Sequence, residues 1–124
     1  VIGLNARTLE LLFEIRLDAT ALAAPRCIDQ ATYLLSRSAV LWRVEGSRAE
    51  RMVELQGAAR ASLAEVDGHL VIGLLDGRLI ALDPSGRRRW QQQLPRSVVA
   101  PAVARGSALF VPLINGEIWK LSDG

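Results

Sequence analysis

Apolar and turn-forming residues recur along the chain with a period of about 38 residues, and this period constrains the fold more than any other feature of the sequence. Four sets of anchor positions are spaced by 38 or 39 residues. They are Pro25, Leu63 and Pro101; Val44, Leu82 and Leu121; Phe13, Met52 and Trp90; and Leu17, Leu55 and Leu94. Because each copy of a repeat forms the same small unit, the sequence predicts similar units that pack against their neighbours along the chain.

Turn signals divide each copy into short strands. In residues 68–94, an Asp76-Gly77 turn and a Pro84-Ser85-Gly86 turn separate three apolar or alternating runs, which indicates three strands joined by tight hairpins. Asn115-Gly116 repeats the first of these turns in the next copy, and Ser38-Ala39 takes its place in the copy before. The turn chemistry is therefore repeated even where the letters differ.

Four short strands in about 38 to 40 residues are typical of the blade of a β-propeller, in which four-stranded sheets surround a central axis. A helical solenoid would instead show an apolar period of about 3.6 residues, which these segments lack. Residues 7–17 are compatible with a helix or a strand, but their alignment with residues 85–94 favours a strand. The expected fold class is all-β, with blades made of four-stranded antiparallel sheets.

Residues 76–90 read D-G-R-L-I-A-L-D-P-S-G-R-R-R-W, and this stretch resembles the pyrroloquinoline-quinone-like (quinoprotein-type) β-propeller repeat, whose usual core is D-G-x-L-x-A-L-D-x-x-G-x-x-x-W. Residues 115–121 match the first half of that core. Residues 4–13 are similar to its second half, with Phe13 in place of Trp and one residue inserted. The resemblance implies propeller blades, whereas its name describes the repeat and implies no cofactor.

Laid out on this repeat, residues 1–124 form a partial propeller. Its expected parts are 1–17, the end of a blade; 18–56, a blade; 57–94, a blade; and 95–124, the start of a blade. Propellers close with about four to eight blades, so about three blades make an incomplete ring or a fragment of a larger propeller. The remaining blades are expected from another segment of a larger protein or from a homo-oligomer.

An open arc exposes the faces of its terminal blades, which carry the apolar alternation of packed sheets. The residues expected on such a face are Leu109, Val111, Ile118 and Leu121.

Composition excludes several classes of function. A net charge of +2 is nearly balanced, and no apolar run approaches the roughly 20 residues that span a bilayer, so neither a nucleic-acid partner nor membrane insertion is expected. Cys27 is the single cysteine and His69 the single histidine, which excludes an internal disulfide and a structural zinc site. No catalytic, cofactor-binding or metal-binding residue is predicted, and Cys27 is expected to be a small buried hydrophobe.

The connections between blades and the turns in the middle of each blade are expected on one side of the ring, where loops on a rigid scaffold meet partners. They comprise residues 18–23, 36–38, 56–60, 76–77, 95–97 and 115–116. The predicted partner-binding residues are Trp119, Arg96 and Asn115. Trp90 is expected to wedge between neighbouring blades. Residues 87–89 are three consecutive arginines on an outer strand, where alternate side chains point to opposite faces, so they are expected to be solvated.

The favoured function is a non-catalytic binding or scaffold module, part of a larger bacterial protein, that binds a protein or ligand through its loops. A quinoprotein dehydrogenase fragment is the first alternative; it needs a complete ring, calcium ligands and a catalytic Asp, none of which is assigned here. An outer-membrane assembly-type lipoprotein propeller is the second, and it rests on fold resemblance alone. The compartment, extracytoplasmic or cytoplasmic, is left open by the sequence.

Overall fold

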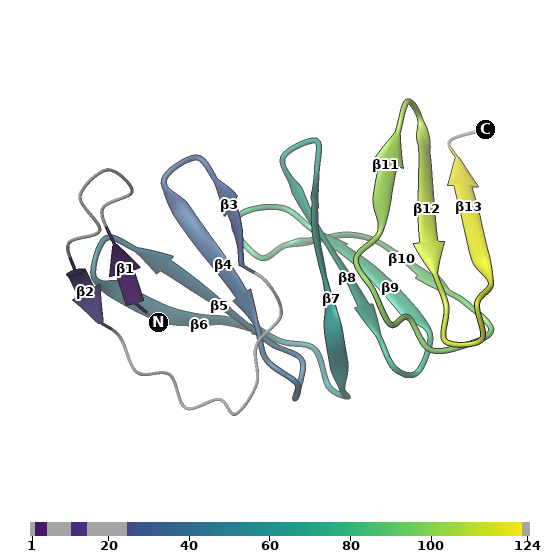
Figure 1. The fold of residues 1–124 in the computed structure, drawn as a ribbon, viewed down its shortest axis with the longest axis horizontal. Coiled ribbons are helices and arrows are strands. Elements are labelled where there is room, and N and C mark those ends of the chain that lie inside the picture. The colour runs from purple at the N-terminus through teal and green to yellow at the C-terminus, as the bar shows by residue number, and fades with distance from the viewer. Residues whose placement is uncertain (1, 5–10, 15–24, 123–124) are drawn as a thin grey trace.

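The computed structural model describes residues 2–4, 11–14 and 25–122, and in these ranges every regular element is a strand. Thirteen strands follow one another in antiparallel sheets (Figure 1). An N-terminal pair is formed by β1 (Ile2–Leu4) and β2 (Leu11–Glu14). The other described strands form three larger sheets, and the all-β propeller fold predicted from the repeat is confirmed.

We name the larger sheets in chain order. Sheet I comprises β3 (Arg26–Ile28), β4 (Ala31–Leu35), β5 (Val40–Glu45) and β6 (Arg48–Glu54). Sheet II comprises β7 (Ala59–Val66), β8 (His69–Leu74), β9 (Arg78–Leu82) and β10 (Arg88–Gln93). Sheet III comprises β11 (Val103–Arg105), β12 (Ala108–Pro112) and β13 (Ile118–Ser122). In each sheet, strands that are consecutive in the sequence are neighbours. The boundaries that the sequence predicts for the individual blades stay a prediction.

The middle turn of each sheet has the same backbone conformation. Gly77 N donates to Leu74 O at 3.1 Å, and Gly116 N donates to Leu113 O at 3.1 Å, with positive φ angles of 91° and 85° at the glycines. Sheet I makes this turn without glycine: its Ala39 has a φ of 64°. A positive φ is uncommon for a residue with a Cβ, so the turn is retained in sheet I despite the unfavourable residue.

The sheets pack face to face through two separate hydrophobic cores. The first core joins sheets I and II and includes Tyr33, Leu41, Ile72 and Ile80. The second joins sheets II and III and includes Val71 and Leu79 from sheet II with Val111 from sheet III. The two middle strands of sheet II, β8 and β9, are therefore buried on both faces, as expected for a blade with a neighbour on each side.

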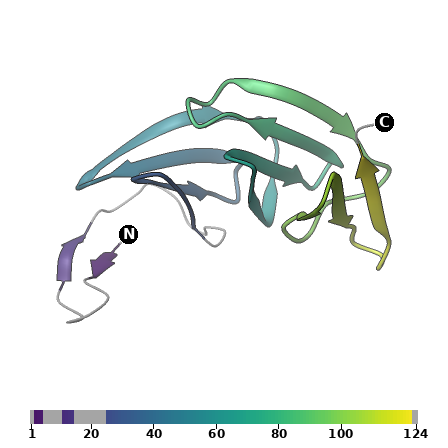
Figure 2. The same cartoon turned by 90° about the horizontal axis from the view of Figure 1, so that it is seen from above.

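The sheets follow one another along an arc (Figure 2). Their first strands lie closest together, since β7 contacts both β3 and β11, whereas β10, the last strand of sheet II, is exposed along its whole length. The first strands thus lie on the inside and the last strands on the outside of the arc. Residues 87–89 belong to this exposed outer region, in agreement with their expected solvation.

The structure corrects two expectations about burial. Leu109, Val111 and Leu121 do not lie on the open face of the last sheet, because they pack against the second core. Ile118 does lie on that face and is 67% exposed, since it is paired with Pro112 and alternates with the inward-facing positions of β13.

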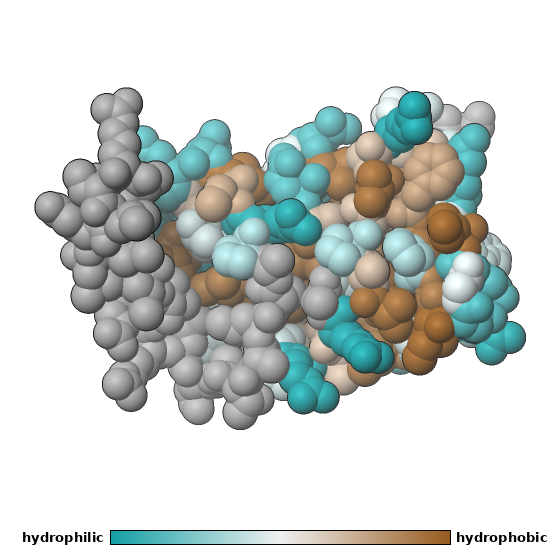
Figure 3. Space-filling model, in the orientation of Figure 1, coloured by the Kyte–Doolittle hydropathy of each residue, from teal (hydrophilic) through white to brown (hydrophobic). Residues whose placement is uncertain are grey.

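Cys27 is exposed and not buried, because β3 contributes it to an outward position opposite Thr32. Apolar surface gathers over sheet III (Figure 3).

Candidate functional site

The connections between sheets and the middle turns lie on one side of the arc, as the repeat layout predicts. Leu75 N donates to Ala58 O at 2.9 Å, which ties the middle turn of sheet II to the connection that precedes this sheet. Ile114 N donates to Ser97 O at 3.1 Å and makes the same tie for sheet III. We refer to this side as the loop rim. Residues 18–23, also expected there, lie outside the described residues.

All three predicted partner-binding residues meet at one carboxylate on the loop rim. Asn115 Nδ2 donates to Glu117 Oε1 at 2.9 Å, and Trp119 Nε1 donates to Glu117 Oε2 at 3.2 Å. Arg96 Nε lies 3.7 Å from Glu117 Oε1. Arg96 comes from the connection between sheets II and III, and the other three residues come from the turn before β13 and from β13 itself. We call these four residues the Glu117 cluster.

The cluster favours an ionised carboxylate. Hydrogen bonds from the Asn115 amide and the Trp119 indole lower the pKa of Glu117, and the positive charge of Arg96 lowers it further. Because these donors stabilise the charged form, Glu117 stays negatively charged at neutral pH. The cluster is also open to solvent: the Trp119 residue is 40% exposed, and the side chains of Arg96 and Glu117 are 55% and 43% exposed.

The corresponding position in sheet II shows what is particular to the Glu117 cluster. Arg78, which follows the Asp76-Gly77 turn, forms an ion pair with Asp76 at 2.7 Å and donates to the carbonyl of Leu55 at 3.2 Å. It also donates to the carbonyl of Gln56, so it ties its turn to the preceding connection. Its side chain is 20% exposed. The same position therefore serves as a largely covered tether in sheet II and as an open charged group in sheet III.

The sequence pattern does not identify Glu117 as a residue of the site. A signal for it was present, because both Asx-Gly turns are followed directly by a charged residue, Arg78 in one copy and Glu117 in the next. The Asp or Asn side chain at the start of the turn then lies two residues before the charged side chain and forms a hydrogen bond with it, as Asp76 does with Arg78. Loop position and side-chain type predict Asn115, Arg96 and Trp119, but they do not indicate the residue that joins them.

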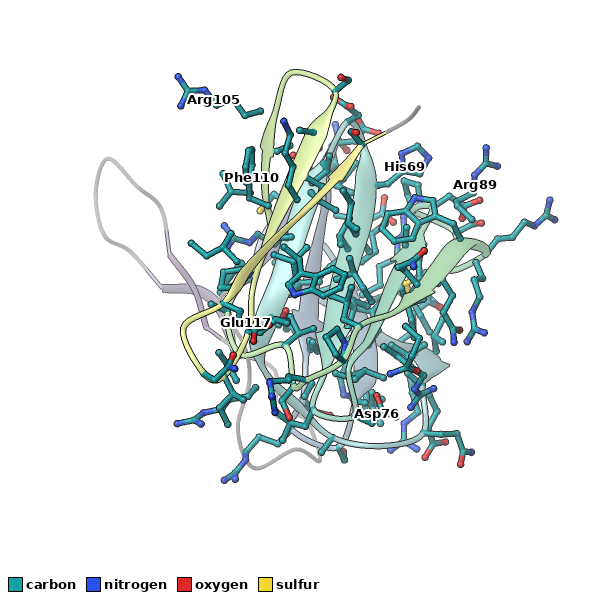
Figure 4. The ribbon with its side chains drawn as sticks, turned by 90° about the vertical axis from the view of Figure 1, so that its right-hand side faces the viewer. His69, Asp76, Arg89, Arg105, Phe110 and Glu117 are labelled. Carbon is teal, nitrogen blue, oxygen red and sulfur yellow. The ribbon has the colours of Figure 1, made fainter. Side chains whose placement is uncertain are left out.

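A concave region lies at the end of the sheets opposite the loop rim. It has a volume of about 710 Å³ and lies between sheets II and III, with Trp90 on its wall. Trp90 is opposite Ala81 in β9, on the face that looks toward sheet III, but it is 41% exposed. Figure 4 shows Glu117 and Asp76 toward one end of the sheets and His69 and Arg89 toward the other. We call this region the outer groove.

Two further features concern membranes and metals. No helix in the described part of the chain is long and apolar enough to cross a membrane. Within residues 2–4, 11–14 and 25–122, no three His, Cys, Asp or Glu side chains are grouped so that they could hold a metal ion.

The repeated turns and the stacked antiparallel sheets define a β-propeller region made of pyrroloquinoline-quinone-like repeats, and the predicted repeat type is confirmed. A family model described as outer membrane protein assembly factor BamB matches residues 1–117, and the chain belongs to this family. A search of the curated proteins finds no match to the sequence.

Solved structures show the same fold. BamB from Moraxella catarrhalis is 29% identical, with a TM-score of 0.70 over 87% of this chain and 34% of that protein. The computationally designed Ika4 protein is 16% identical, with a TM-score of 0.81 over 99% of this chain and 79% of the designed protein. A europium-containing methanol dehydrogenase is 14% identical, with a TM-score of 0.65 over 79% of this chain and 22% of the enzyme. The chain thus spans about a third of the Moraxella protein.

Proposed function

We propose that this propeller region is a non-catalytic binding module that holds a partner protein through the Glu117 cluster on its loop rim. The observation that carries the proposal is the convergence of Arg96, Asn115 and Trp119 on one ionised and exposed carboxylate. The family description, an assembly factor for outer membrane proteins, supports a role in binding other proteins.

The composition of the cluster suits protein recognition. Trp and Arg are enriched among the residues that dominate binding energy at protein interfaces. Trp119 offers an exposed aromatic surface whose indole N–H is already held by Glu117, so little side-chain freedom is lost when a partner binds. Arg96 and Glu117 place both signs of charge beside that surface, which favours a partner with complementary charges at the border of its contact.

The lowered pKa of Glu117 argues against one catalytic role for this residue, that of a general acid. A general acid works best when its pKa lies near the operating pH. The pKa of Glu117 is instead lowered by its hydrogen bonds, so the group carries no proton to give at neutral pH. Supplying the chain with pyrroloquinoline quinone, Ca²⁺ and a primary alcohol is expected to give no reduction of an electron-accepting dye. Turnover in that assay would contradict the non-catalytic part of the proposal.

Affinity capture with matched variants tests the binding part. The immobilised chain is incubated with a lysate of the organism that encodes it, and the retained proteins are quantified by mass spectrometry. Trp119→Ala is expected to lower retention of the specific partner by about tenfold or more, the usual effect at a dominant interface residue. Arg105→Ala removes an exposed side chain at the far end of sheet III and is expected to retain the partner (Figure 4). Equal loss with both variants, or no protein whose retention depends on Trp119, would contradict the proposal.

A further inference from the structure

The middle turns of the three larger sheets expose a residue at the same position. Each turn is closed by a hydrogen bond to the carbonyl of its first residue, and its second residue lies at the tip. The tip residues are Arg37 in sheet I, Leu75 in sheet II and Ile114 in sheet III. All three are exposed, Leu75 to 37% and Ile114 to 58%. We call these three residues the tip row, which lies at the end of the sheets opposite the outer groove.

Hydrogen bonds join the three tips through the connections between the sheets. In the connection before sheet II, residues 58–59 donate to Arg37 O and accept from Leu75 N, each at 2.9 Å. In the next connection, Ser97 Oγ donates to Leu75 O, and Ile114 N donates to Ser97 O at 3.1 Å. The tip row is therefore continuous along the loop rim, and its backbone is held in place before any partner binds.

The fold does not explain why two of the three tips are aliphatic. The second position of such a turn accepts most residue types, so its geometry requires neither Leu nor Ile. Neither Leu75 nor Ile114 packs against either of the hydrophobic cores found in the described residues. Single exposed apolar side chains are common on protein surfaces, but these two recur at one position of adjacent blades. Adjacent exposed apolar side chains indicate a surface for interaction.

Leu75 is the stronger of the two observations, because sheet II has a described neighbour on each side. The connections before and after this sheet both bond its tip, and the Leu75 residue is nevertheless 37% exposed. Its exposure therefore belongs to the complete repeat and does not depend on a position at the edge of the described chain.

The charge of the loop rim indicates the kind of partner. Asp76 pairs with Arg78, and Glu117 lies beside Arg96. Two more arginines belong to the described rim residues 36–38, 56–60, 75–78, 95–97 and 114–117, which contain no further carboxylate: they are Arg37 and Arg60. Both are exposed, and no ion pair to either is found in the described part of the chain. The rim therefore has an excess of positive charge beside the aliphatic tips, and acidic residues are complementary to it.

We propose that the loop rim binds a segment of its partner protein in which acidic residues precede aliphatic ones. The acidic residues contact Arg37, and the aliphatic side chains contact Leu75 and Ile114. This inference rests on the proposed function, since it names the chemistry of the partner that the rim holds. Ile114 directly precedes Asn115, so the tip row and the Glu117 cluster are contiguous and one partner can cover both.

The covered state of Leu75 favours a peptide over a membrane surface. Membrane-surface binding buries a large apolar face among the lipid headgroups and chains. Leu75 is more than half covered by its own chain, and the tip row contains no aromatic side chain. A peptide side chain can contact such a partly covered residue from above, and the fixed backbone of the tips lowers the entropic cost of that contact.

Peptide binding tests the inference. The probes are synthetic peptides in which a run of aspartates precedes two leucines at increasing separations, and the control peptides carry lysines in place of the aspartates. The fluorescence anisotropy of a dye on each peptide reports its binding to the chain. We expect saturable binding of aspartate peptides that weakens as the ionic strength rises, and none of the lysine peptides. Absence of binding by every aspartate peptide, or equal binding of the lysine peptides, would overturn the proposal.

Substitution of an aliphatic tip locates the bound peptide. Leu75→Ser is expected to weaken peptide binding by about fivefold or more, because it removes apolar contact and leaves the backbone bonds of the tip in place. Val103→Ser is the control: Val103 on β11 is 61% exposed and lies outside the loop rim, so its affinity is expected to be unchanged. Circular dichroism checks the fold, and Ile114→Ser takes the place of Leu75→Ser if that variant is unfolded. Equal effects of tip and control variants would overturn the proposed location.

Charge reversal tests the acidic part of the recognition. Arg37→Glu is expected to weaken binding of the aspartate peptides by about threefold or more. Arg105→Glu, at the far end of sheet III, makes the same change of net charge and is expected to have a smaller effect (Figure 4). If the two reversals weaken binding equally, the attraction comes from net charge alone and the contact at Arg37 is wrong.

The outcomes separate this inference from the proposal for the Glu117 cluster. Partner capture that depends on Trp119, with no binding of any aspartate peptide, would support the cluster and overturn the tip row. Peptide binding that Leu75→Ser weakens, with capture independent of Trp119, would support the tip row and contradict the cluster. Sedimentation with vesicles of phosphatidylglycerol and phosphatidylethanolamine tests the other occupant. Vesicle binding that Leu75→Ser abolishes, without peptide binding, would assign the tip row to a membrane surface and overturn the proposal.

Discussion

Val71 and Ile72 are neighbours on β8, yet they belong to different hydrophobic cores: Ile72 packs with sheet I and Val71 packs with sheet III. Strand geometry requires this division, because successive side chains point to opposite faces of a sheet. Since both residues are almost fully buried, β8 has no solvent-facing side at this point. Sheet II therefore couples the stability of the sheets on either side of it.

Ile72→Ala is expected to lower the free energy of unfolding by about 2 to 5 kcal/mol, because the side chain is fully buried and its removal leaves a cavity between sheets I and II. Urea denaturation followed by circular dichroism measures the change. Gln92→Ala on the exposed strand β10 is the control and is expected to change stability by less than about 0.5 kcal/mol. Equal effects of the two substitutions would contradict the packing described for β8.

Gly73→Ala is expected to destabilise the chain by about 1 to 3 kcal/mol, since the added methyl group would overlap Val98 and lie 2.6 Å from Ser62 Oγ. Shortening the neighbour should relieve the overlap. In the double variant Gly73→Ala with Val98→Ala, the loss is therefore expected to be smaller than the sum of the two single losses. Thermal unfolding of the four proteins tests this coupling, and strict additivity would show that the two residues do not meet.

Tyr33→Phe is expected to lower the free energy of unfolding by about 1 kcal/mol. The Tyr33 hydroxyl donates to Pro84 O at 2.8 Å and links sheet I to the hairpin of sheet II, and the phenylalanine variant removes that bond while keeping the ring. Chemical denaturation measures the effect. An unchanged stability would indicate that the hydroxyl bonds water equally well and that the link contributes nothing.

Asp83 is expected to make the free energy of unfolding fall as the pH becomes acidic. Hydrogen bonds from the Ser85 hydroxyl and from the backbone N–H of Arg87 hold the pKa of Asp83 below its ordinary value. The stabilisation is fully present above the unfolded-state pKa of about 4, and it is lost as the pH falls through the lower pKa of the folded protein. Asp83→Asn is expected to be less stable than the unmodified chain at pH 7, with the difference shrinking below about pH 4. A difference that is independent of pH would contradict this role.

Repetition explains why much of the fold could be predicted from the sequence. The Asp76-Gly77 and Asn115-Gly116 turns recur at one place in the repeat, and the structure has a hairpin turn at both. Spacing alone predicts the equivalent turn at Ser38-Ala39, and the structure shows the same turn there. Local turn chemistry and the apolar period agree at these positions, so local and overall preferences favour the same structure.

Details that depend on pairing between strands were not predictable. Spacing aligns Trp90 with Met52, but the pairing of β5 with β6 is irregular at Leu41/Trp42, and that of β9 with β10 is irregular at Arg88/Trp90. A bulge shifts the pairing of every residue beyond it. Trp90 therefore lies opposite Ala81 in sheet II, whereas at the corresponding position of sheet I the residue opposite Arg43 is Glu50. The Glu117 cluster likewise arises from tertiary contact between a connection and a strand, which a linear pattern does not specify.

Site-specific photocrosslinking tests the central claim, that the Glu117 cluster is the partner-binding surface, most directly. A photoreactive phenylalanine analogue replaces Trp119 in one protein and Arg105, at the far end of sheet III, in another (Figure 4). Irradiation in cells is expected to give a discrete crosslinked protein from position 119 and none from position 105, and Arg96→Glu is expected to reduce its yield. Crosslinks from position 105 but not from position 119 would place the partner elsewhere and contradict the binding surface proposed for this chain.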